Sequence, residues 1–347
     1  MAIVKKIILC GFGNVGRALA RLLEAKQHDL EAQYDLEIEL QAVVDIGGAA
    51  VAEDTGLPPG PLSDFVEAGG AVEKFEGFGH PGLMAADVLA QGKADILVET
   101  TPTNLEDGEP ARTHFLAAIE NGLDIIAANK GPLVLDYRRI LERARDKGVQ
   151  IRFSAATAAA LPTLDVGRLC TAGARIKAIE GILNGTTNYI LTRMAQEGCP
   201  YSDALQDAQR LGIAETDPTL DVEGLDTRNK IVLIANTLFE LSLDPGAVET
   251  TGITGVTPAD IATASKAGKV IKLIGSARHA ENGLVVKVAP EALSADHPLA
   301  GVNLSEKGIS YDTDTMGRIT TTGGHSSPTG AAAAMLKDLI HLVKLGI

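Results

Sequence analysis

The feature of this sequence that most restricts its fold is a glycine motif placed between a strand and a helix. Ile3–Cys10 is a short apolar run rich in β-branched residues, and it leads directly into Gly11-Phe12-Gly13-Asn14-Val15-Gly16. Apolar residues then recur at helical spacing over Asn14–Ala25. In this context Gly11 permits a tight turn, Gly13 lets the backbone approach a pyrophosphate, and Gly16 allows close helix–strand packing. The six residues predict a dinucleotide site, and a glycine-rich turn without a ligand is the less favoured alternative.

Strands and helices alternate through the first 150 residues. Further strands are expected at Ile38–Val44, Ala94–Glu99, Leu123–Ala127 and Val149–Phe153, and helices at Ala111–Glu120 and Leu133–Lys147. This alternation predicts a Rossmann-type α/β domain, a parallel sheet covered on both faces. Residues 55–79 are rich in Gly and Pro and are expected to form an irregular crossover.

The pattern changes from about Ser154. A strand is expected at Ile176–Leu183, followed by helices at Gly185–Gln196, Ser202–Leu211 and Thr227–Glu240. Later strands are expected at Val270–Arg278, Leu284–Ala289, Gly308–Asp312 and Arg318–Thr322, and an amphipathic helix at Pro328–Leu345 closes the chain. A second domain of different organisation is therefore predicted.

Charge and cysteine content exclude several classes of protein. The formal net charge is −14, which argues against non-specific binding to nucleic acid or to an anionic membrane. The three cysteines, Cys10, Cys170 and Cys199, are far apart, so neither a disulfide framework nor a metal site is predicted. The apolar N-terminal run is too short to span a bilayer, and the cytoplasm is the expected compartment.

Two positions bear on the choice of cofactor. Asp45 ends the second predicted strand and is placed to accept hydrogen bonds from an adenosine ribose; a strand-end turn acid is the alternative. No Lys or Arg occurs between Lys26 and Lys74, so no cation is available nearby for a 2′-phosphate, and NAD is predicted over NADP. Thr100 and Thr101 follow another strand, where their hydroxyls would contact the nicotinamide ribose or cap a helix.

Charged residues gather in the second half of the chain. Glu215, Asp217, Asp221, Asp226 and Lys230 lie within sixteen residues. Carboxylates suit the ammonium of an amino-acid substrate, and a cation suits a carbonyl that receives a hydride and a proton. Asp226 and Lys230 share a face if a helix begins near Asp226, and an ordinary surface ion pair is the alternative. The acids do not have the spacing of an EF-hand calcium loop.

Several segments resemble one known family. They are Ala127-Ala128-Asn129-Lys130-Gly131-Pro132, then GILNGTTNYIL and AQRLGIAETDPTLDVEGLDTRNK within residues 181–230, TGITGVTPADI (251–261), IKLIG (271–275) and SSPTGAAAAMLKDLI (326–340). These resemble the signature regions of homoserine dehydrogenase. The resemblance covers nearly the whole chain and fits the short form of the family, without an aspartate kinase or a C-terminal amino-acid-sensing domain.

The resemblance implies an architecture and an activity. Residues 151–325 would form an α+β catalytic and dimerisation domain, and the helix in 326–347 would complete the nucleotide-binding domain of residues 1–150. The implied reaction is the reversible NAD(P)-dependent reduction of L-aspartate 4-semialdehyde to L-homoserine, a step of threonine and methionine biosynthesis. A homodimer acting on a small amino acid is expected. A related dehydrogenase of another small amino or hydroxy acid and a non-catalytic dinucleotide sensor are the alternatives.

The resemblance also assigns roles to residues. Lys230 matches the proton donor and acceptor, Asp226 its substrate-binding neighbour, and Lys130 a second lysine near substrate and nicotinamide. The remaining matches are Glu215 and the loop Asn184-Gly185-Thr186 for the substrate, and Gly212 and Gly324 for the cofactor. We also assign Asp221 to the substrate. Lys130 is expected to lie close to Lys230, where its charge would assist proton transfer.

Two positions depart from the family pattern. Ser154 stands where the family often has a Glu that helps to hold a monovalent cation, so only the backbone carbonyls near Thr157 and Ala159 are left for such an ion. His325 stands where a small residue is usual, and it is expected to cap the final helix rather than to contact the cofactor.

Overall fold

The computed structural model describes residues 2–53, 55–281, 283–324 and 326–345. It divides into two compact units, Met1–Ala156 with Ser327–Ile347, and Thr157–Ser326. The division falls after Ala156 rather than after residue 150, because the Ser154 amide and hydroxyl both donate to the buried Asp338 carboxylate, at 2.9 and 2.7 Å. None of the described helices is long and apolar enough to cross a membrane.

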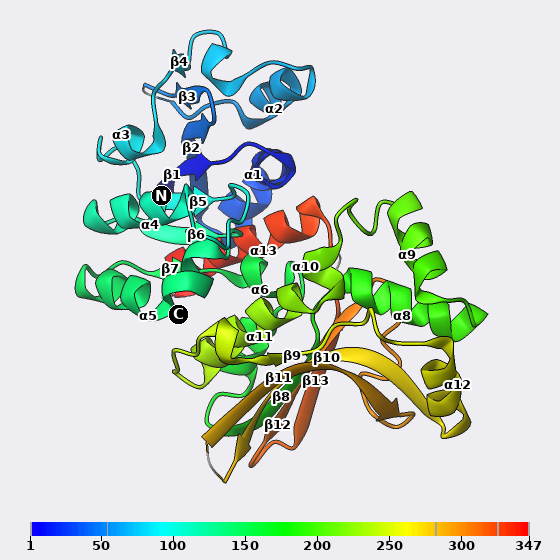
Figure 1. The fold of residues 1–347 in the computed structure, drawn as a ribbon. Coiled ribbons are helices and arrows are strands. Elements are labelled where there is room, and N and C mark those ends of the chain that lie inside the picture. Colours follow the sequence, from blue (N-terminus) through cyan, green and yellow to red (C-terminus); the bar gives the residue numbers. More distant parts are fainter. Residues whose placement is uncertain (1, 54, 282, 325, 346–347) are drawn as a thin grey trace. The chain divides into compact units, whose positions relative to one another are not determined.

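The first unit is built on a seven-stranded sheet of order β4-β3-β2-β1-β5-β6-β7. Its strands are β1 Ile3–Cys10, β2 Leu36–Asp45, β3 Gly48–Val51, β4 Gly79–Pro81, β5 Ile96–Glu99, β6 Asp124–Ala127 and β7 Ile151–Arg152. Its helices are α1 Asn14–Tyr34, α2 Pro59–Glu67, α3 Ala85–Leu89, α4 Ala111–Glu120, α5 Gly131–Asp146, α6 Ser154–Ala158 (which runs past the boundary) and α13 Pro328–Ile340. Helices α1 and α13 lie on one side of the sheet, and α3, α4 and α5 on the other (Figure 1).

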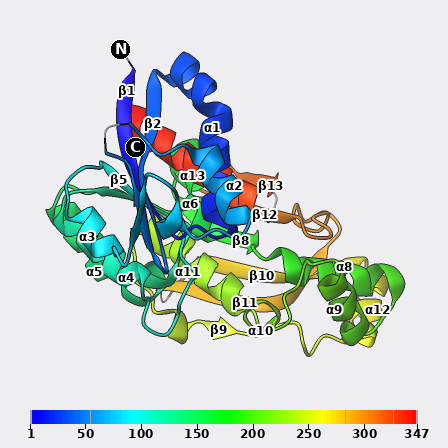
Figure 2. The same ribbon diagram turned by 90° about the horizontal axis from the view of Figure 1, so that it is seen from above.

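The core of this unit explains why the C-terminal helix belongs to it. Met335 and Leu339 of α13 are fully buried in one cluster with Ile7 and Leu9 of β1 and with Leu19 of α1. Figure 2 shows α13 beside α1, although residues 35–327 separate the two helices in the sequence. Burial of such side chains contributes about 1.5–3 kcal/mol each.

The structure corrects three expectations for this unit. The sheet is mixed, because β3 pairs antiparallel with β2 and β4 antiparallel with β3. Residues 55–79 are not irregular: they contain α2 and a 3₁₀ turn at Val72–Lys74. The three prolines of this segment, Pro58, Pro59 and Pro61, stand at the N-cap and in the first turn of α2, where proline is favoured. The fully buried Leu62 holds the helix against the core. Helix α1 runs nine residues beyond the expected Ala25 because Leu30 continues its buried face.

The second unit contains a six-stranded sheet of order β13-β12-β8-β10-β11-β9. The strands are β8 Ile176–Ile182, β9 Glu249–Thr250, β10 Lys269–Ala280, β11 Gly283–Ser294, β12 Lys307–Thr313 and β13 Arg318–Gly323. The helices are α7 Thr163–Asp165, α8 Gly185–Glu197, α9 Tyr201–Arg210, α10 Thr219–Val222, α11 Leu225–Leu238 and α12 Pro258–Lys266. Among the strand pairings of the described residues in this sheet, only that of β11 with β9 is parallel.

One face of this sheet carries the helices that hold the candidate catalytic residues. A Cβ atom at Gly275 of β10 would lie 3.0 Å from Thr227 and 3.2 Å from Ile231 of α11, so the sheet side of α11 packs directly on the strand (Figure 1). The predicted strands and long helices of this unit are confirmed to within a few residues, except that β10 and β11 are longer. The chain's last helix gives way at His341 to a π-helical turn, His341–Leu345.

Candidate active site

The glycine motif forms the turn that its spacing predicts. Gly11 has φ +87°, and a Cβ atom there would lie 2.6 Å from the amide nitrogen of Thr101. At Gly16 a Cβ atom would lie 2.3 Å from the carbonyl oxygen of Gly11. At Gly13 nothing lies within 4 Å of the same position, and no side chain caps the N-terminus of α1 that begins there. The turn therefore leaves open the place where a pyrophosphate would meet the helix amides.

The other motif residues surround this turn. Phe12 is buried, at 1% exposure, and its carbonyl oxygen accepts a hydrogen bond from Arg17. Asn14 and Val15 begin α1, and Asn14 is exposed beside Arg17, from which it also accepts a hydrogen bond. The backbone of Gly13 and the start of α1 thus remain the open part of the motif.

Strand order places this turn at the point where ligands bind in open α/β sheets. The chain passes from β1 to β2 on one side and later to β5 on the other, which makes the carboxyl ends of β1 and β5 the switch point. Asp45 ends β2 beside this point, since the Gly11 amide donates to the carbonyl of Val44. Its carboxylate accepts a hydrogen bond from the amide of Ile46, as a strand-end turn acid does.

Thr100 and Thr101 do not cap a helix, because α4 begins only at Ala111. The Thr100 hydroxyl donates to the carbonyl oxygen of Gly11 at 2.6 Å, and the Thr101 hydroxyl donates to Glu99. Their hydroxyl protons thus hold the turn together. The Thr101 oxygen also accepts a hydrogen bond from Asn129 at 3.1 Å, whereas the lone pairs of the Thr100 oxygen remain for a ligand.

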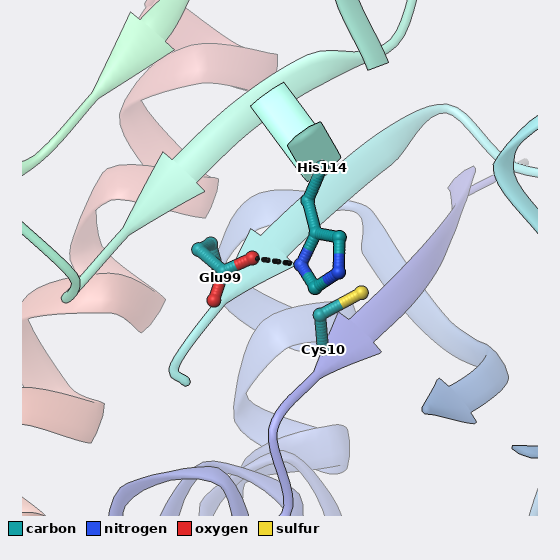
Figure 3. A group of neighbouring side chains, drawn as sticks. All are labelled: Cys10, Glu99 and His114. Atoms are coloured by element: carbon teal, nitrogen blue, oxygen red, sulfur yellow. Dashed lines mark hydrogen bonds and ion pairs between the residues drawn. The ribbon is translucent and has the colours of Figure 1, made fainter. Parts of the chain in front are cut away.

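A buried cluster of Cys10, Glu99 and His114 lies beneath this turn (Figure 3). Glu99 is fully buried, and its carboxylate accepts the Thr101 amide at 2.8 Å, the Thr101 hydroxyl, and a hydrogen bond from His114 Nδ1 at 2.7 Å. Burial, and secondarily the Glu99 carboxylate, raise the pKa of the Cys10 thiol well above its usual range. These three side chains are of types that bind metal ions. Hydrogen bonds already satisfy the Glu99 carboxylate, so we interpret the cluster as a support for the turn.

Asn129 joins this turn to Lys130. Its side-chain amide nitrogen lies 3.0 Å from the carbonyl oxygens of both Thr101 and Pro102. Its carbonyl oxygen accepts the amide of Gly131 at the start of α5. Lys130 is the N-cap residue of α5, so the network fixes the backbone from which Lys130 projects.

In the second unit, Asp226 and Lys230 form the predicted pair. Helix α11 begins at Leu225, and the Asp226 carboxylate lies 2.6 Å from the Lys230 ammonium. The two side chains are only 12% and 17% exposed, and the ammonium also donates to the carbonyl of Leu183 at 3.0 Å. The pair is therefore not an ordinary surface salt bridge.

The loop at the start of α8 joins the same cluster. The Asn184 side-chain amide donates to Asp221 at 2.6 Å and to Asp226 at 2.9 Å, while its carbonyl oxygen caps α8 at the amide of Thr187. Burial, and next the nearby Asp226 charge, raise the pKa of Asp221. Thr186 donates to the carbonyl of Ile213 and is a further hydrogen-bond partner of Asp221. Gly185 is buried, and a Cβ atom there would lie 2.8 Å from the carbonyl of Ser305.

Three predicted site residues stay apart from this cluster. Glu215 is exposed in the loop after α9, and among the described residues its side chain has no hydrogen bond or ion pair to the cluster. Gly212 follows α9 with φ +70°, and Gly324 follows β13 with φ +72°, close against the backbone of Leu161. His325 lies outside the described residues, and the final helix is capped by Ser327, whose hydroxyl accepts the amide of Gly330.

The turn at residues 155–160 contains a feature that sequence reasoning missed. Lys307, at 1% exposure, donates from its ammonium to the carbonyl of Ala158 at 2.5 Å. Ala159 takes φ +51°, an uncommon value for a non-glycine residue. The Ser154 hydroxyl turns to Asp338 instead.

Sequence reasoning also missed Glu99, His114 and Asn129. Asn129 stood inside a quoted motif, and Glu99 stood at a strand end, but nothing local shows that they bond to Thr101. The partners come from separate strands and helices, so their pairing depends on the tertiary structure.

Comparison with known proteins agrees with this geometry. The family model for the NAD-binding domain of homoserine dehydrogenase matches residues 11–154, and the homoserine dehydrogenase model matches residues 162–340. Homoserine dehydrogenase of Methanocaldococcus jannaschii is 39% identical over 97% of this chain and 98% of its own. NAD(+)-dependent homoserine dehydrogenase of Pseudomonas canavaninivorans is 34% identical over 97% and 96%.

A solved structure gives the same result. A putative homoserine dehydrogenase of Archaeoglobus fulgidus superposes with a TM-score of 0.86 at 30% identity, covering 98% of this chain and 99% of that one. The Rossmann-type unit and the buried acid–lysine cluster together define a nicotinamide-dependent oxidoreductase. More narrowly, the chain belongs to the homoserine dehydrogenase family, as the sequence motifs predicted.

The glycine turn yields a first prediction. Gly13→Ala adds a methyl group where, among the described residues other than its chain neighbours, no atom lies within 4 Å. The free protein should therefore keep its thermal stability while the Kd for NADH rises at least about tenfold. Gly16→Ala is the matched variant: its Cβ meets the Gly11 carbonyl, and it should lower the free energy of unfolding by about 1–3 kcal/mol. Fluorescence titration and thermal melts measure both. Normal NADH affinity in Gly13→Ala would remove the assignment of this turn to the pyrophosphate.

Proposed function

We propose that the protein interconverts L-aspartate 4-semialdehyde and L-homoserine with NAD(H), and that Lys230 handles the proton. The single observation that carries this proposal is the buried Asp226–Lys230 pair, held at 2.6 Å and joined through Asn184 to Asp221. The names of the relatives at 34–39% identity support the same substrate. Bound NAD(H) would supply or accept the hydride at the reacting carbon.

Lys230 is suited to proton transfer by its hydrogen bonds. A lysine ammonium has three N–H groups, and those directed at Asp226 and at the Leu183 carbonyl leave one for the substrate oxygen. In the reduction this group donates its proton to the carbonyl oxygen as the hydride arrives at carbon; in the oxidation the neutral amine takes the proton back. Asp226 holds the ammonium in place.

The substrate's own charges fit the neighbouring side chains. Asp221 and Glu215 would bind its ammonium, and the loop Asn184-Gly185-Thr186 would line the pocket. Lys130 would act beside the nicotinamide, in agreement with the network that fixes its backbone. The approach of Lys130 to Lys230 joins residues of two different units and remains a prediction. At the turn 155–160, a monovalent cation bound by the carbonyls of Thr157 and Ala159 would have to share the turn with the Lys307 ammonium.

Removal of the Lys230 amine tests the reaction. Lys230→Ala should lower kcat for semialdehyde reduction about 100-fold or more while the Kd for NADH stays within twofold. Lys266→Ala, an exposed lysine on α12, should behave as the parent enzyme. A kcat within twofold of the parent in Lys230→Ala would contradict the role. Assays with a panel of small amino and hydroxy aldehydes test whether the enzyme acts on a different substrate. No turnover with any of them would favour a non-catalytic dinucleotide sensor.

We propose further that the protein prefers NAD to NADP because two carboxylates flank the ribose end of the site. Beyond Asp45, the carboxylate of Glu73 lies against the turn after β2: a Cβ atom at Gly47 would lie 2.6 Å from it. Among the described residues, no hydrogen bond or ion pair neutralises the Glu73 carboxylate, and the residue is only partly exposed. A 2′-phosphate would meet this negative charge.

Kinetics with both cofactors test this second carboxylate. Glu73→Gln should raise the ratio of kcat/KM for NADPH to that for NADH by about fivefold to tenfold, because one repulsive charge is removed. Glu76→Gln, an exposed acid on the next turn, is the control and should leave the ratio unchanged. An equal response of the two variants, or a parent enzyme that prefers NADPH, would contradict the proposal.

We also propose a homodimer formed through the face of the second sheet that lies away from α11. On this face, paired residues of four adjacent strands lie side by side: Ser276 of β10, Glu180 of β8, Ser310 of β12 and Thr320 of β13. Nearby on the same face, Arg278 is 61% exposed in its side chain and Val285 is 56% exposed. Light scattering should give the mass of two 36.1 kDa chains. Val285→Glu should weaken the dimer, whereas Met84→Glu, on the first unit, should not; a monomeric parent would contradict it.

A further inference from the structure

Lys307 is a buried lysine that the reaction as described does not use. It is the first residue of β12 and is among the largest side chains that are fully buried, at 1% exposure. Its ammonium donates a hydrogen bond to the Ala158 carbonyl, at 2.5 Å. No carboxylate forms a salt bridge with it in the described chain, and an ammonium buried without a counter-ion is costly. Because a lysine in the core is costly, we looked to the neighbouring active-site residues for its function.

Sheet register brings Lys307 beside the Asp226–Lys230 pair. Strand β12 pairs antiparallel with β8, with Gly308 opposite Ile182, so Lys307 comes beside Leu183, whose carbonyl accepts a hydrogen bond from the Lys230 ammonium at 3.0 Å. Burial is the main cause that lowers the pKa of Lys307, and the positive charge of Lys230 is the next; Asp226 acts in the opposite direction. Together they bring the pKa of Lys307 to about 7. From α6 the group that faces it is the uncharged Ala158 carbonyl. All of these residues belong to the same unit, so this arrangement does not depend on how the two units meet.

We propose that Lys307 is a positioning residue that acts on Lys230 through its charge, favouring release of the Lys230 proton to the substrate oxygen. The electrostatic interaction between the two ammonium groups is mutual, so each disfavours a proton on the other. The charge also stabilises the negative charge that develops on the substrate oxygen during reduction. This inference rests on the proposed role of Lys230 and goes beyond it by naming what drives the transfer.

The effect of Lys307 on proton donation by Lys230 should depend on pH. Below about pH 7 Lys307 carries its charge and assists donation by Lys230; above that pH it becomes neutral and the assistance is lost. Reduction of the semialdehyde should therefore show an inflection near pH 7 in kcat/KM. Lys307→Met, which is never charged, should lose this inflection and run about tenfold slower than the parent at pH 6.

The chain offers a matched control in a second buried lysine. Lys272 of β10 is 2% exposed, donates to Asn188, Asn303 and the Val302 carbonyl, and has its pKa lowered to about 8, mainly by burial. The charged group that acts on Lys272 is Glu306 rather than Asp226 or Lys230. Lys272→Met should cost stability but keep the inflection near pH 7. If Lys307→Met lowers kcat/KM by one factor at every pH, as Lys272→Met would, the role is structural and the proposal is wrong.

Stability supplies a readout that does not depend on activity. A lysine with a pKa of about 7 in the folded protein and about 10.4 when unfolded binds more protons in the unfolded state between these values. The free energy of unfolding of the parent, relative to Lys307→Met, should therefore rise as the pH increases from 7 to 10. Urea titrations at several pH values measure this difference.

The two readouts separate the possible failures. If the free energy of unfolding of the parent and that of Lys307→Met change with pH in the same way, Lys307 does not titrate in this range and the inference is wrong. A rising difference without any change in the kinetic inflection would show a desolvated lysine that does not act on Lys230. Full activity of Lys230→Ala would instead remove the proposed function itself, whatever Lys307 does.

Discussion

The close approach of backbone at the ends of β1 and β5 is the constraint on which the nucleotide-binding unit depends. Gly11, Gly16 and the Thr100–Thr101 turn lie so near one another that a single methyl group at either glycine would displace main-chain atoms. Thr100 ties the turn to Gly11, and the buried Glu99 holds Thr101 from below. These contacts hold the turn in one conformation, in which the backbone of Gly13 faces open space.

The second unit depends on buried charge rather than on close backbone contact. Asp221, Asp226 and Lys230 are brought together by Asn184, which also caps α8 and so fixes the cluster to a helix end. Two other lysines, Lys272 and Lys307, are almost completely buried in the same unit. The first is surrounded by oxygen acceptors, whereas the second donates to one carbonyl and is influenced by the charges of Lys230 and Asp226. This difference in environment is the reason why a role in the reaction is proposed for Lys307 and not for Lys272.

Much of the fold followed from local patterns, and the failures have physical causes. Long amphipathic or β-branched segments such as β1, α4, α8 and α11 were located well because their burial pattern is continuous in the sequence. Helix α2 was missed because proline-rich segments usually form loops, whereas the prolines of this helix stand at its start, where they are compatible with a helix. The antiparallel strands β3 and β4 were missed because they are short, and short strands have little periodicity.

The sequence by itself determined the family, the glycine turn and the Asp226–Lys230 pair, because each depends on motifs whose residues lie close together along the chain. The tertiary structure alone decided which distant groups meet them: His114 with Glu99, Glu73 with the turn after Asp45, and Lys307 with Lys230. Burial and charge act through space, and residues separated by dozens of positions carry no local sign that they will be neighbours. The residues expected to do the chemistry were therefore readable from the sequence, whereas those proposed to tune it were not.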